Sequence, residues 1–286
     1  MTTTIGILGT GDMGSAVARC LTGEGLAVIT ALEGRSSRSK SLAGDAGMLD
    51  KGSLNELVEG ADVMLSIMPP SEATGFAERL CPLIETSGRD VLFVDCNAIS
   101  PGSLAGIASI AESHGVRFHD VGIVGAAPRP DRSPVRFYSS GAYTDQVEAL
   151  AGPLIDVRTI GDEPGKASAL KMIYASMTKG TNALRAAALI AGESLGVGEQ
   201  IRAEWQESQP DAWRVMENRL AYFPSVAGRW TGEMREIADT YRSAGLTPRF
   251  HEGAEWVYEL LAEADIAADQ DIDAALSAFM AALEKR

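Results

Sequence analysis

The chain of 286 residues contains only three cysteines and three histidines. Cys20, Cys81 and Cys96 lie far apart, without the spacing of metal ligands, and their odd number excludes a closed disulfide framework. The histidines form no cluster of ligands either, so we expect no metal site. Each cysteine has apolar neighbours in the sequence and is predicted to be a reduced core residue.

Positive charge is also scarce, because 25 lysines and arginines stand against 39 acidic residues and give a formal net charge of −14. Proteins that bind nucleic acid need a basic surface, so nucleic acid is not an expected partner. No apolar run approaches the roughly 18 residues of a membrane span. Residues 1–4 lack the basic segment that opens a signal peptide. We therefore expect a soluble cytoplasmic protein that binds no membrane.

Short apolar runs alternate with helical stretches over the first 160 residues. The expected strands are residues 5–8, 26–32, 63–67, 91–94, 116–119 and 135–139, and the first expected helix spans residues 13–21. Runs of this kind, separated by helices, predict a parallel sheet covered by helices on both faces. Residues 1–160 are therefore expected to form an α/β domain.

The pattern changes after residue 160. Residues 167–195 are rich in Ala, Leu and Met, contain no proline, and predict one long helix. Further helices are expected near residues 198–206, 212–222, 231–243, 254–264 and 272–284, and no strand is expected. Residues 161–286 are thus predicted to form an all-α domain that begins with the long helix.

Three glycines follow the first expected strand, in the run Gly9-Thr10-Gly11-Asp12-Met13-Gly14. Between a strand and a helix, the first glycine allows a tight turn, the second lets the backbone approach a pyrophosphate, and the third lets the helix pack closely. The helix N-terminus adds N–H donors and the positive end of its dipole. All six residues are therefore predicted to bind the cofactor of a Rossmann domain. The alternative is a glycine-rich turn without a ligand.

The end of the second strand indicates which dinucleotide binds. An NAD site usually carries an acidic residue about 20 positions after the glycines, and Glu33 is the candidate. However, Arg35, Ser36 and Arg38 follow it and offer guanidinium and hydroxyl groups to a 2′-phosphate. A carboxylate would repel that phosphate, so we expect Glu33 to point elsewhere. NADP is the expected cofactor and NAD the alternative, unless the arginines are only solvated surface residues.

Two further stretches lie where expected strands end. They are Met68-Pro69-Pro70 and the segment around Asn97. An open sheet of this type binds its ligand at the carboxyl ends of its strands. We therefore expect these four residues to contact the cofactor and Asn97 to contact the substrate as well, although ordinary loop chemistry would also account for them.

With these motifs the sequence resembles the β-hydroxyacid dehydrogenases, relatives of 6-phosphogluconate dehydrogenase. The resemblance rests on the glycine turn, on residues 120–126, which correspond to the family's substrate loop, and on residues 161–171, a glycine-containing helix start that leads to the family's catalytic lysine, here Lys171. It implies hydride transfer between NADP(H) and a small hydroxy acid or related carbonyl compound. It also supports a homodimer that buries the C-terminal helices.

The sequence departs from the family at several positions. Gly122 and Val124 stand where the substrate loop usually has Pro and Ser, and Tyr174 stands at one of two positions that commonly hold Asn. A Lys-Asp pair of the family's later helices is replaced by Glu233-Met234. The chain therefore resembles a divergent branch of the family with a distinct helical domain.

The position of the substrate loop predicts that Gly122, Ile123 and Val124 contact the substrate. Trp230, in the later helices, is the tryptophan that we expect near the pocket. The other tryptophans are expected to pack between helices.

Lys171 is the predicted general acid and base, because hydride transfer needs a group that exchanges a proton with the substrate oxygen. Apolar neighbours would lower the pKa of its ammonium group toward neutrality. Tyr174, one turn further along the helix, is predicted either to donate to the same oxygen or to orient the substrate. At helical spacing, Thr178 and Asn182 share this face and predict a wetted, functional stripe. The alternative is that Lys171 is solvated and Tyr174 only packs.

Two other functions remain open at this stage. The first is an imine reductase, which has the same two-part design and would use Tyr174. The second is a dinucleotide-binding protein without catalytic activity, which the missing Ser and Asn residues would favour.

Overall fold

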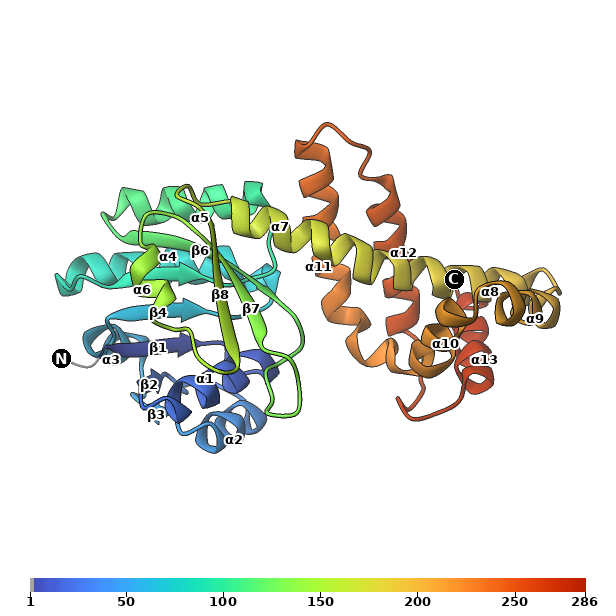
Figure 1. Ribbon diagram of the computed structural model, residues 1–286, viewed down its shortest axis with the longest axis horizontal. Helices are drawn as coiled ribbons and strands as arrows, with labels where there is room; N and C mark the ends of the chain where they lie inside the picture. The colour runs from blue at the N-terminus through green and yellow to red at the C-terminus, as the bar shows by residue number, and fades with distance from the viewer. Residues whose placement is uncertain (1–2) are drawn as a thin grey trace. The chain divides into compact units, whose positions relative to one another are not determined.

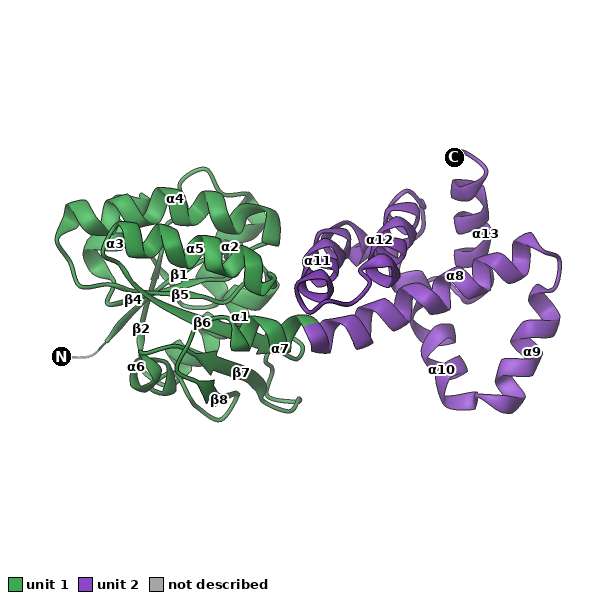
Figure 2. Ribbon diagram, turned by 90° about the horizontal axis from the view of Figure 1, so that it is seen from above, with its two compact units in different colours: residues 1–172 green, residues 173–286 purple. Residues whose placement is uncertain are grey.

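The computed structural model describes residues 3–286, so Met1 and Thr2, on which the expectation about a signal peptide partly rests, lie outside the described residues. Contacts divide the chain into two compact units, residues 1–172 and residues 173–286, which have different colours in Figure 2. The division falls within helix α7 (Lys166–Ala175). The last strand ends at Gly161, so the architecture changes earlier in the chain than the contacts divide it.

The first unit is built on one eight-stranded sheet with the order β3-β2-β1-β4-β5-β6-β7-β8 (Figure 1). The strands are β1 (Thr4–Leu8), β2 (Ala27–Thr30), β3 (Leu49–Asp50), β4 (Val63–Ser66), β5 (Leu92–Asp95), β6 (Arg117–Val124), β7 (Val135–Ser140) and β8 (Ile155–Gly161). Neighbouring strands are parallel except β6 and β7, which are antiparallel. The order of the first six strands is that of a Rossmann domain, so the predicted fold class is confirmed.

Two strands were not expected from the sequence. They are β3 and β8, which lie at the two edges of the sheet. Both residues of β3 are exposed, and β8 is fully buried only at Ile155. Edge strands of this kind lack the continuous apolar run that identifies a strand buried on both faces.

Helices cover both faces of the sheet, as the alternation in the sequence predicts. Residues of α1 (Asp12–Gly23), α2 (Ser37–Asp45) and α6 (Thr144–Glu148) share one apolar core with the sheet. Residues of α3 (Leu54–Gly60), α4 (Pro70–Ser87) and α5 (Pro101–Ser113) share the other core. Successive side chains of β2, β4 and β5 enter opposite cores, because side chains of a strand alternate between its faces.

The second unit contains helices only among its described elements. These are the π-helix η1 (Ser176–Gly180), α8 (Thr181–Ser194), α9 (Gly198–Ser208), α10 (Pro210–Arg219), the 3₁₀ turn η2 (Leu220–Tyr222), α11 (Pro224–Ser243), α12 (Arg249–Ala262) and α13 (Ile272–Leu283). The all-α C-terminal region is therefore confirmed. The expected long helix is present as α7, η1 and α8, which follow one another without a gap in the sequence.

The π-helix changes which residues share a face of this long helix. Tyr174 is 44% exposed, whereas Asn182 is only 7% exposed. The expectation of one wetted polar stripe through both residues is therefore wrong. A π turn closes hydrogen bonds between residues five apart and adds a residue to the turn, so the α-helical spacing does not continue across it.

Candidate functional site

The glycine turn has the geometry that the sequence predicts for its first and third glycines. Gly9 has a φ of 99°, and a Cβ there would lie 1.9 Å from the carbonyl oxygen of Ile67. A Cβ on Gly14 would lie 2.0 Å from the carbonyl oxygen of Gly9. Both glycines are therefore required by the packing of β1 against α1.

Gly11 differs from the other two glycines, because apart from Gly11 and its chain neighbours no described residue has an atom within 4 Å of the position that a Cβ would take. It is the N-cap of α1, and no side chain caps the helix there. The neighbouring Thr10 is 1% exposed, and its hydroxyl has no hydrogen-bond partner among the described residues. A helix N-terminus without a cap, beside an open glycine and a buried hydroxyl, fits the pyrophosphate of a dinucleotide.

A cavity of about 210 Å³ opens beside the turn. Gly9, Arg35 and Met68 line it, so the structure brings together three of the predicted cofactor residues from three different loops. Glu33 lines the same cavity, whereas the sequence analysis expected it to point elsewhere.

Sequence reasoning missed six residues of this cavity, of which three lie on α4 and are Glu72, Phe76 and Arg79. Their spacing of four and three residues places them on one face of the helix. This spacing is the feature of the sequence that could have indicated that the three residues lie together. Arg79 adds a second guanidinium group to the cavity that Arg35 lines.

The other predicted cofactor residues serve local structure. The Ser36 hydroxyl accepts a hydrogen bond from the Ser39 amide at 3.2 Å and caps α2. Arg38 pairs with Asp12 at 2.5 Å, and both side chains are exposed. This ion pair links the first turn of α2 to the first residue of α1, within the glycine turn.

Three further predicted residues lie beside these loops. Pro69 is the N-cap of α4, and Pro70 opens the helix, where proline loses no helical hydrogen bond. Met13 is partly buried and packs on the apolar core of the first unit.

Asn97 is 2% exposed, and its side chain is held from three sides. Its Nδ2 donates to Asp95 Oδ2 at 2.7 Å and to Ser66 Oγ at 2.9 Å. Its Oδ1 accepts from the Met68 amide at 2.7 Å. Both N–H groups of the amide are thus used within the protein, which leaves only oxygen lone pairs for a ligand.

Residues 120–124 of the expected substrate loop are part of strand β6. The segment is a strand and not a loop because it pairs with β7, with Gly122, Ile123 and Val124 opposite Tyr138, Phe137 and Arg136. That these residues contact the substrate stays a prediction. Ile123 and Val124 are at most 3% exposed. Their side chains therefore belong to the interior, and their backbone is the part that a substrate could contact.

Gly122 is needed for packing. A Cβ there would lie 2.4 Å from the carbonyl oxygen of Ala167 and 3.0 Å from the Cβ of Lys171. Helix α7 therefore lies directly on β6 at this residue. Lys171 is half-buried, and its Nζ donates to the carbonyl oxygen of Ile123. The structure thus joins the predicted catalytic lysine to the predicted substrate segment.

The start of α7 is fixed to β6 by the carboxylate of Asp120. Asp120 Oδ2 accepts from the amides of Gly165 at 2.8 Å and Ser168 at 3.1 Å, and Oδ1 accepts from Ser168 Oγ at 2.7 Å. Burial raises the pKa of Asp120, while these hydrogen bonds lower it in part. Burial also raises the pKa of the neighbouring Asp95, to about 7.

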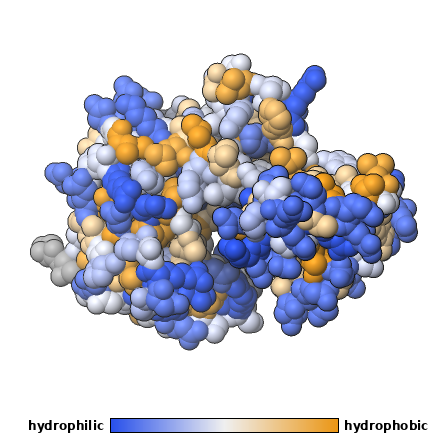
Figure 3. Space-filling view, turned by 45° about the vertical axis from the view of Figure 1, so that its right-hand side comes forward, coloured by the Kyte–Doolittle hydropathy of each residue, from blue (hydrophilic) through white to orange (hydrophobic). Residues whose placement is uncertain are grey.

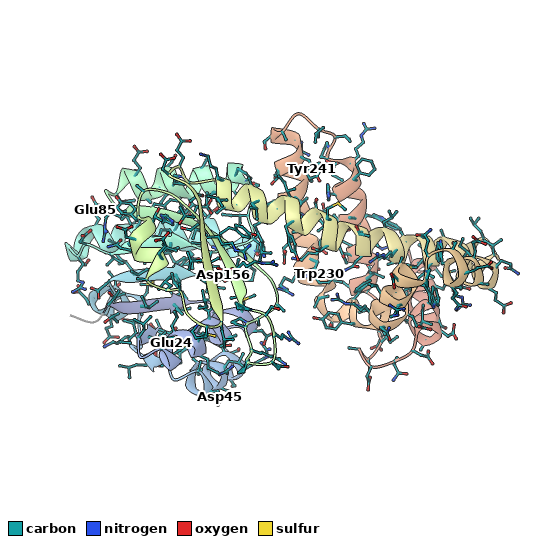
Figure 4. The ribbon with its side chains drawn as sticks, viewed as in Figure 1. Glu24, Asp45, Glu85, Asp156, Trp230 and Tyr241 are labelled. Atoms are coloured by element: carbon teal, nitrogen blue, oxygen red, sulfur yellow. The ribbon has the colours of Figure 1, made fainter. Side chains whose placement is uncertain are left out.

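Tyr174 follows Lys171 by one turn, and its side chain is 44% exposed. Trp230 belongs to the interior of the second unit, where its ring lies 5.9 Å from Phe223 and 5.3 Å from Tyr258 (Figure 4). It is 6% exposed.

Next to Trp230 the second unit contains a buried ion pair. Lys179 pairs with Glu233, whose side chain is only 4% exposed, and the Lys179 ammonium group lies 5.7 Å from the centre of the Trp230 ring. Tyr258 donates to the Lys179 carbonyl oxygen at 2.6 Å. Sequence reasoning did not pair these residues, since only the fold brings them together.

Among residues 3–286, no group of three His, Cys, Asp or Glu side chains is placed to hold a metal ion. Over the same part of the chain, none of the helices combines the length and the apolar character needed to cross a membrane.

Comparison with known proteins gives two family matches. Residues 4–153, more than half of the chain, match the NAD binding domain of 6-phosphogluconate dehydrogenase. Residues 193–261 match a domain of unknown function, DUF1932.

Solved structures share the fold over nearly the whole chain. A conserved protein of unknown function, MTH1747, described as similar to 3-hydroxyacid dehydrogenases, is 27% identical, with 96% of this chain and 99% of that chain covered and a TM-score of 0.66. The 3-hydroxyisobutyrate dehydrogenase of Mycobacterium tuberculosis with L-serine is 21% identical, with coverages of 97% and 99% and a TM-score of 0.69. An imine reductase from Myxococcus stipitatus in complex with NADP+ is 18% identical, with coverages of 97% and 99% and a TM-score of 0.59.

The family match coincides with the strands and the glycine turn of the first unit, and the resemblance noted in the sequence is confirmed. The chain belongs to the family of proteins that carry the NAD binding domain of 6-phosphogluconate dehydrogenase.

Proposed function

We propose that this protein is an NADP-dependent oxidoreductase that interconverts a small hydroxy acid, or a related alcohol, and its carbonyl form. The observation that carries the proposal is the junction of α7 and β6, where Lys171 donates to the Ile123 carbonyl oxygen in the unit that also holds the open glycine turn. A lysine that lies against β6, in the unit that also contains the glycine turn, suits proton exchange with a substrate oxygen.

The bound dinucleotide supplies or accepts the hydride at the substrate carbon. Gly11 and the uncapped amides of α1 would hold its pyrophosphate, with Thr10 as a further donor. In the direction of reduction, Lys171 Nζ would donate a proton to the carbonyl oxygen of the substrate. In the direction of oxidation, neutral Lys171 would take the hydroxyl proton of the substrate. The proton that the lysine gives in one direction is thus the proton that it accepts in the other.

The preference for NADP is supported by the cavity beside the turn. Arg35 and Arg79 both line it and offer guanidinium groups to a 2′-phosphate. Glu33 and Glu72 line it as well, so NAD is the alternative that a direct comparison of the two cofactors tests.

The proposed substrate class is supported by the two structures named above, one a 3-hydroxyisobutyrate dehydrogenase and the other described as similar to 3-hydroxyacid dehydrogenases. The backbone of residues 122–124 and Asn97 Oδ1 are the proposed substrate contacts. The limits proposed for the two domains remain residues 1–160 and 161–286.

A second candidate is an imine reductase, and Tyr174 is the residue that favours it. Its exposed phenol lies one turn from Lys171 and offers an acid for an imine nitrogen. Structures of imine reductases share the fold of this chain. The remaining alternative, a dinucleotide-binding protein without turnover, would bind NADPH and act on no substrate.

We also propose that the protein is a homodimer. Large apolar side chains along the long helix of the second unit are exposed, with Met177 and Leu184 at 69% and Leu195 at 77%. Figure 3 shows apolar side chains reaching the surface among polar ones. Burial of such residues against a second copy would remove them from water.

The test is a turnover assay with purified protein. NADPH and NADH are each supplied with a panel of aldehydes, ketones and cyclic imines, and the oxidised cofactors with β-hydroxy acids. Turnover of hydroxy acids or carbonyl compounds with NADPH supports the proposal. Turnover of imines alone selects the second candidate, and binding without any turnover selects the third.

A further inference from the structure

Two buried carboxylates face one another across neighbouring strands at the centre of the proposed site. Asp95 ends β5 and stands opposite Asp120 of β6 in the register of the sheet. Paired residues of parallel strands direct their side chains to the same face, so the two carboxylates lie side by side. Both residues are 0% exposed. Neither carboxylate reaches solvent, so each acts through the groups that it binds.

Asp95 acts on the loop that lines the cofactor cavity. Its Oδ1 accepts from the Asn97 amide at 2.9 Å, and its Oδ2 accepts from Asn97 Nδ2 at 2.7 Å. This fixes the orientation of the Asn97 side chain, because an amide can donate only from its nitrogen. Asn97 Oδ1 then holds the amide of Met68, which lines the cavity. A chain of hydrogen bonds therefore runs from Asp95 to the cofactor cavity.

Asp120 acts on the helix that carries the proposed catalytic lysine. It accepts hydrogen bonds from Gly165, Ser168 and Ser140, and those from the amides of Gly165 and Ser168 fix the start of α7. Lys171 follows Ser168 by one helical turn and lies against β6, the strand that contains Asp120. The Asp120 carboxylate therefore fixes the position of Lys171 along β6.

We infer that Asp95 and Asp120 are positioning residues with separate tasks: Asp95 sets the cofactor loop through Asn97, and Asp120 sets the catalytic helix that carries Lys171. The inference rests on the proposed function. It assigns Asn97 to the support of the cofactor loop, with its N–H groups directed into the protein.

The carboxylates can be tested separately with Asp95→Asn and Asp120→Asn. Either amide loses an acceptor oxygen that the native network uses. Asp156→Asn is the matched control, because Asp156 lies on β8, is 40% exposed in its side chain and pairs with Arg158 (Figure 4). Thermal unfolding of each variant establishes that it is folded in the assays, provided that its unfolding transition lies above the assay temperature.

Two readouts that do not require turnover are measured for each variant. The first is the Kd for NADPH in the absence of substrate, from the fluorescence of the nucleotide. The second is the pKa of the Lys171 amine, from its labelling by acetic anhydride as a function of pH, quantified by mass spectrometry.

We expect Asp95→Asn to raise the Kd for NADPH roughly tenfold, as for a lost buried hydrogen bond, and to leave the labelling of Lys171 unchanged. Asp120→Asn should shift the labelling midpoint of Lys171 by about 0.5 pH unit or more and change the Kd less than about twofold. Asp156→Asn should change neither quantity.

The inference is overturned if both site variants are folded and change both readouts together, or change neither. If an Asp→Asn variant fails to fold, Ser66→Ala and Ser168→Ala replace it, because each removes one hydrogen bond of one network and keeps both carboxylates. We expect the serine variants to separate the Kd for NADPH from the labelling midpoint of Lys171 in the same way, with smaller changes in each. Failure of the proposed function would differ, since the turnover panel would then be negative while the two readouts still separate.

Discussion

The two units bury their charged groups in different ways. The first unit places Asp95 and Asp120 on adjacent strands and surrounds them with backbone amides, hydroxyls and one side-chain amide. The second unit buries a lysine against a glutamate, beneath an aromatic ring. Removal of one donor from a buried carboxylate that has several neutral donors costs one hydrogen bond, whereas removal of one member of a buried ion pair leaves an uncompensated buried charge. The difference therefore predicts distinct responses to substitution.

The largest effect is expected in the second unit, for Glu233→Ala. This change removes the carboxylate that faces Lys179 in a buried setting, and should lower the free energy of unfolding by about 3–5 kcal/mol. Urea unfolding followed by circular dichroism measures it. The double variant Lys179→Met/Glu233→Met should recover much of the loss.

Asp211→Ala is the control for this comparison, because Asp211 and Arg214 form an exposed pair on α10. Its effect should be small, as for most surface ion pairs. Equal destabilisation by Glu233→Ala and Asp211→Ala would contradict the contrast between the units.

The next effect separates two glycines of the first unit. Gly14→Ala places a Cβ 2.0 Å from a carbonyl oxygen and should cost about 1–3 kcal/mol of stability. Gly11→Ser meets no neighbouring atom and places a favourable residue at the N-cap, so stability should be kept. The same serine should weaken NADPH binding, because it occupies the approach to the pyrophosphate.

Thermal unfolding and NADPH titration of both glycine variants give the result. A loss of stability in Gly11→Ser would show that this glycine serves packing. Unchanged NADPH binding in Gly11→Ser would remove the proposed pyrophosphate site from the turn.

Much of the first unit could be predicted from its sequence because strands and turns carry local signals. The glycine turn, the run at Met68 and the segment at Asn97 each follow a strand, and parallel strands bring their carboxyl ends to one edge. The direction of the Asn97 side-chain amide could not be predicted, because it depends on hydrogen bonds to Asp95 and Ser66. Ser66 is distant in the sequence, and Asp95 is buried beside Asn97.

The second unit was less predictable beyond its helices. The pairing of Lys179 with Glu233 spans 54 positions and depends on how α11 packs against η1. The π turn breaks the helical spacing from which the stripe at Tyr174 and Asn182 was expected. No periodic pattern in the sequence marks a single extra residue in a turn.

The smallest effect concerns pH and the first unit's carboxylates. Burial raises the pKa of Asp95 to about 7 from an ordinary value of 3.8, so the folded state binds a proton that the unfolded state releases. Stability should therefore fall as pH rises from about 4 to about 7, by at most about 1.4 kcal/mol per pH unit for one proton. His119 acts oppositely, because burial lowers its pKa to about 4 and stability falls as pH drops below 6.5.

Asp95 and His119 can be separated between pH 6.5 and 7, where the window of Asp95 still applies and that of His119 does not. Urea unfolding across this range should show a falling free energy in the wild type and a flatter line in Asp95→Asn. If the free energy of unfolding changed with pH equally in the two proteins, Asp95 would not be the group responsible for the pH dependence.

The central claim is that Lys171 exchanges the proton in an NADP-dependent reaction. The most direct test compares Lys171→Ala with Lys166→Ala, a control on the same helix, for turnover of the best substrate with saturating cofactor. Lys171→Ala should lower kcat by roughly 10²-fold or more, with NADPH binding kept, and Lys166→Ala should stay near the wild type. A Lys171→Ala enzyme that retains the wild-type kcat would contradict the claim and transfer the acid role to Tyr174.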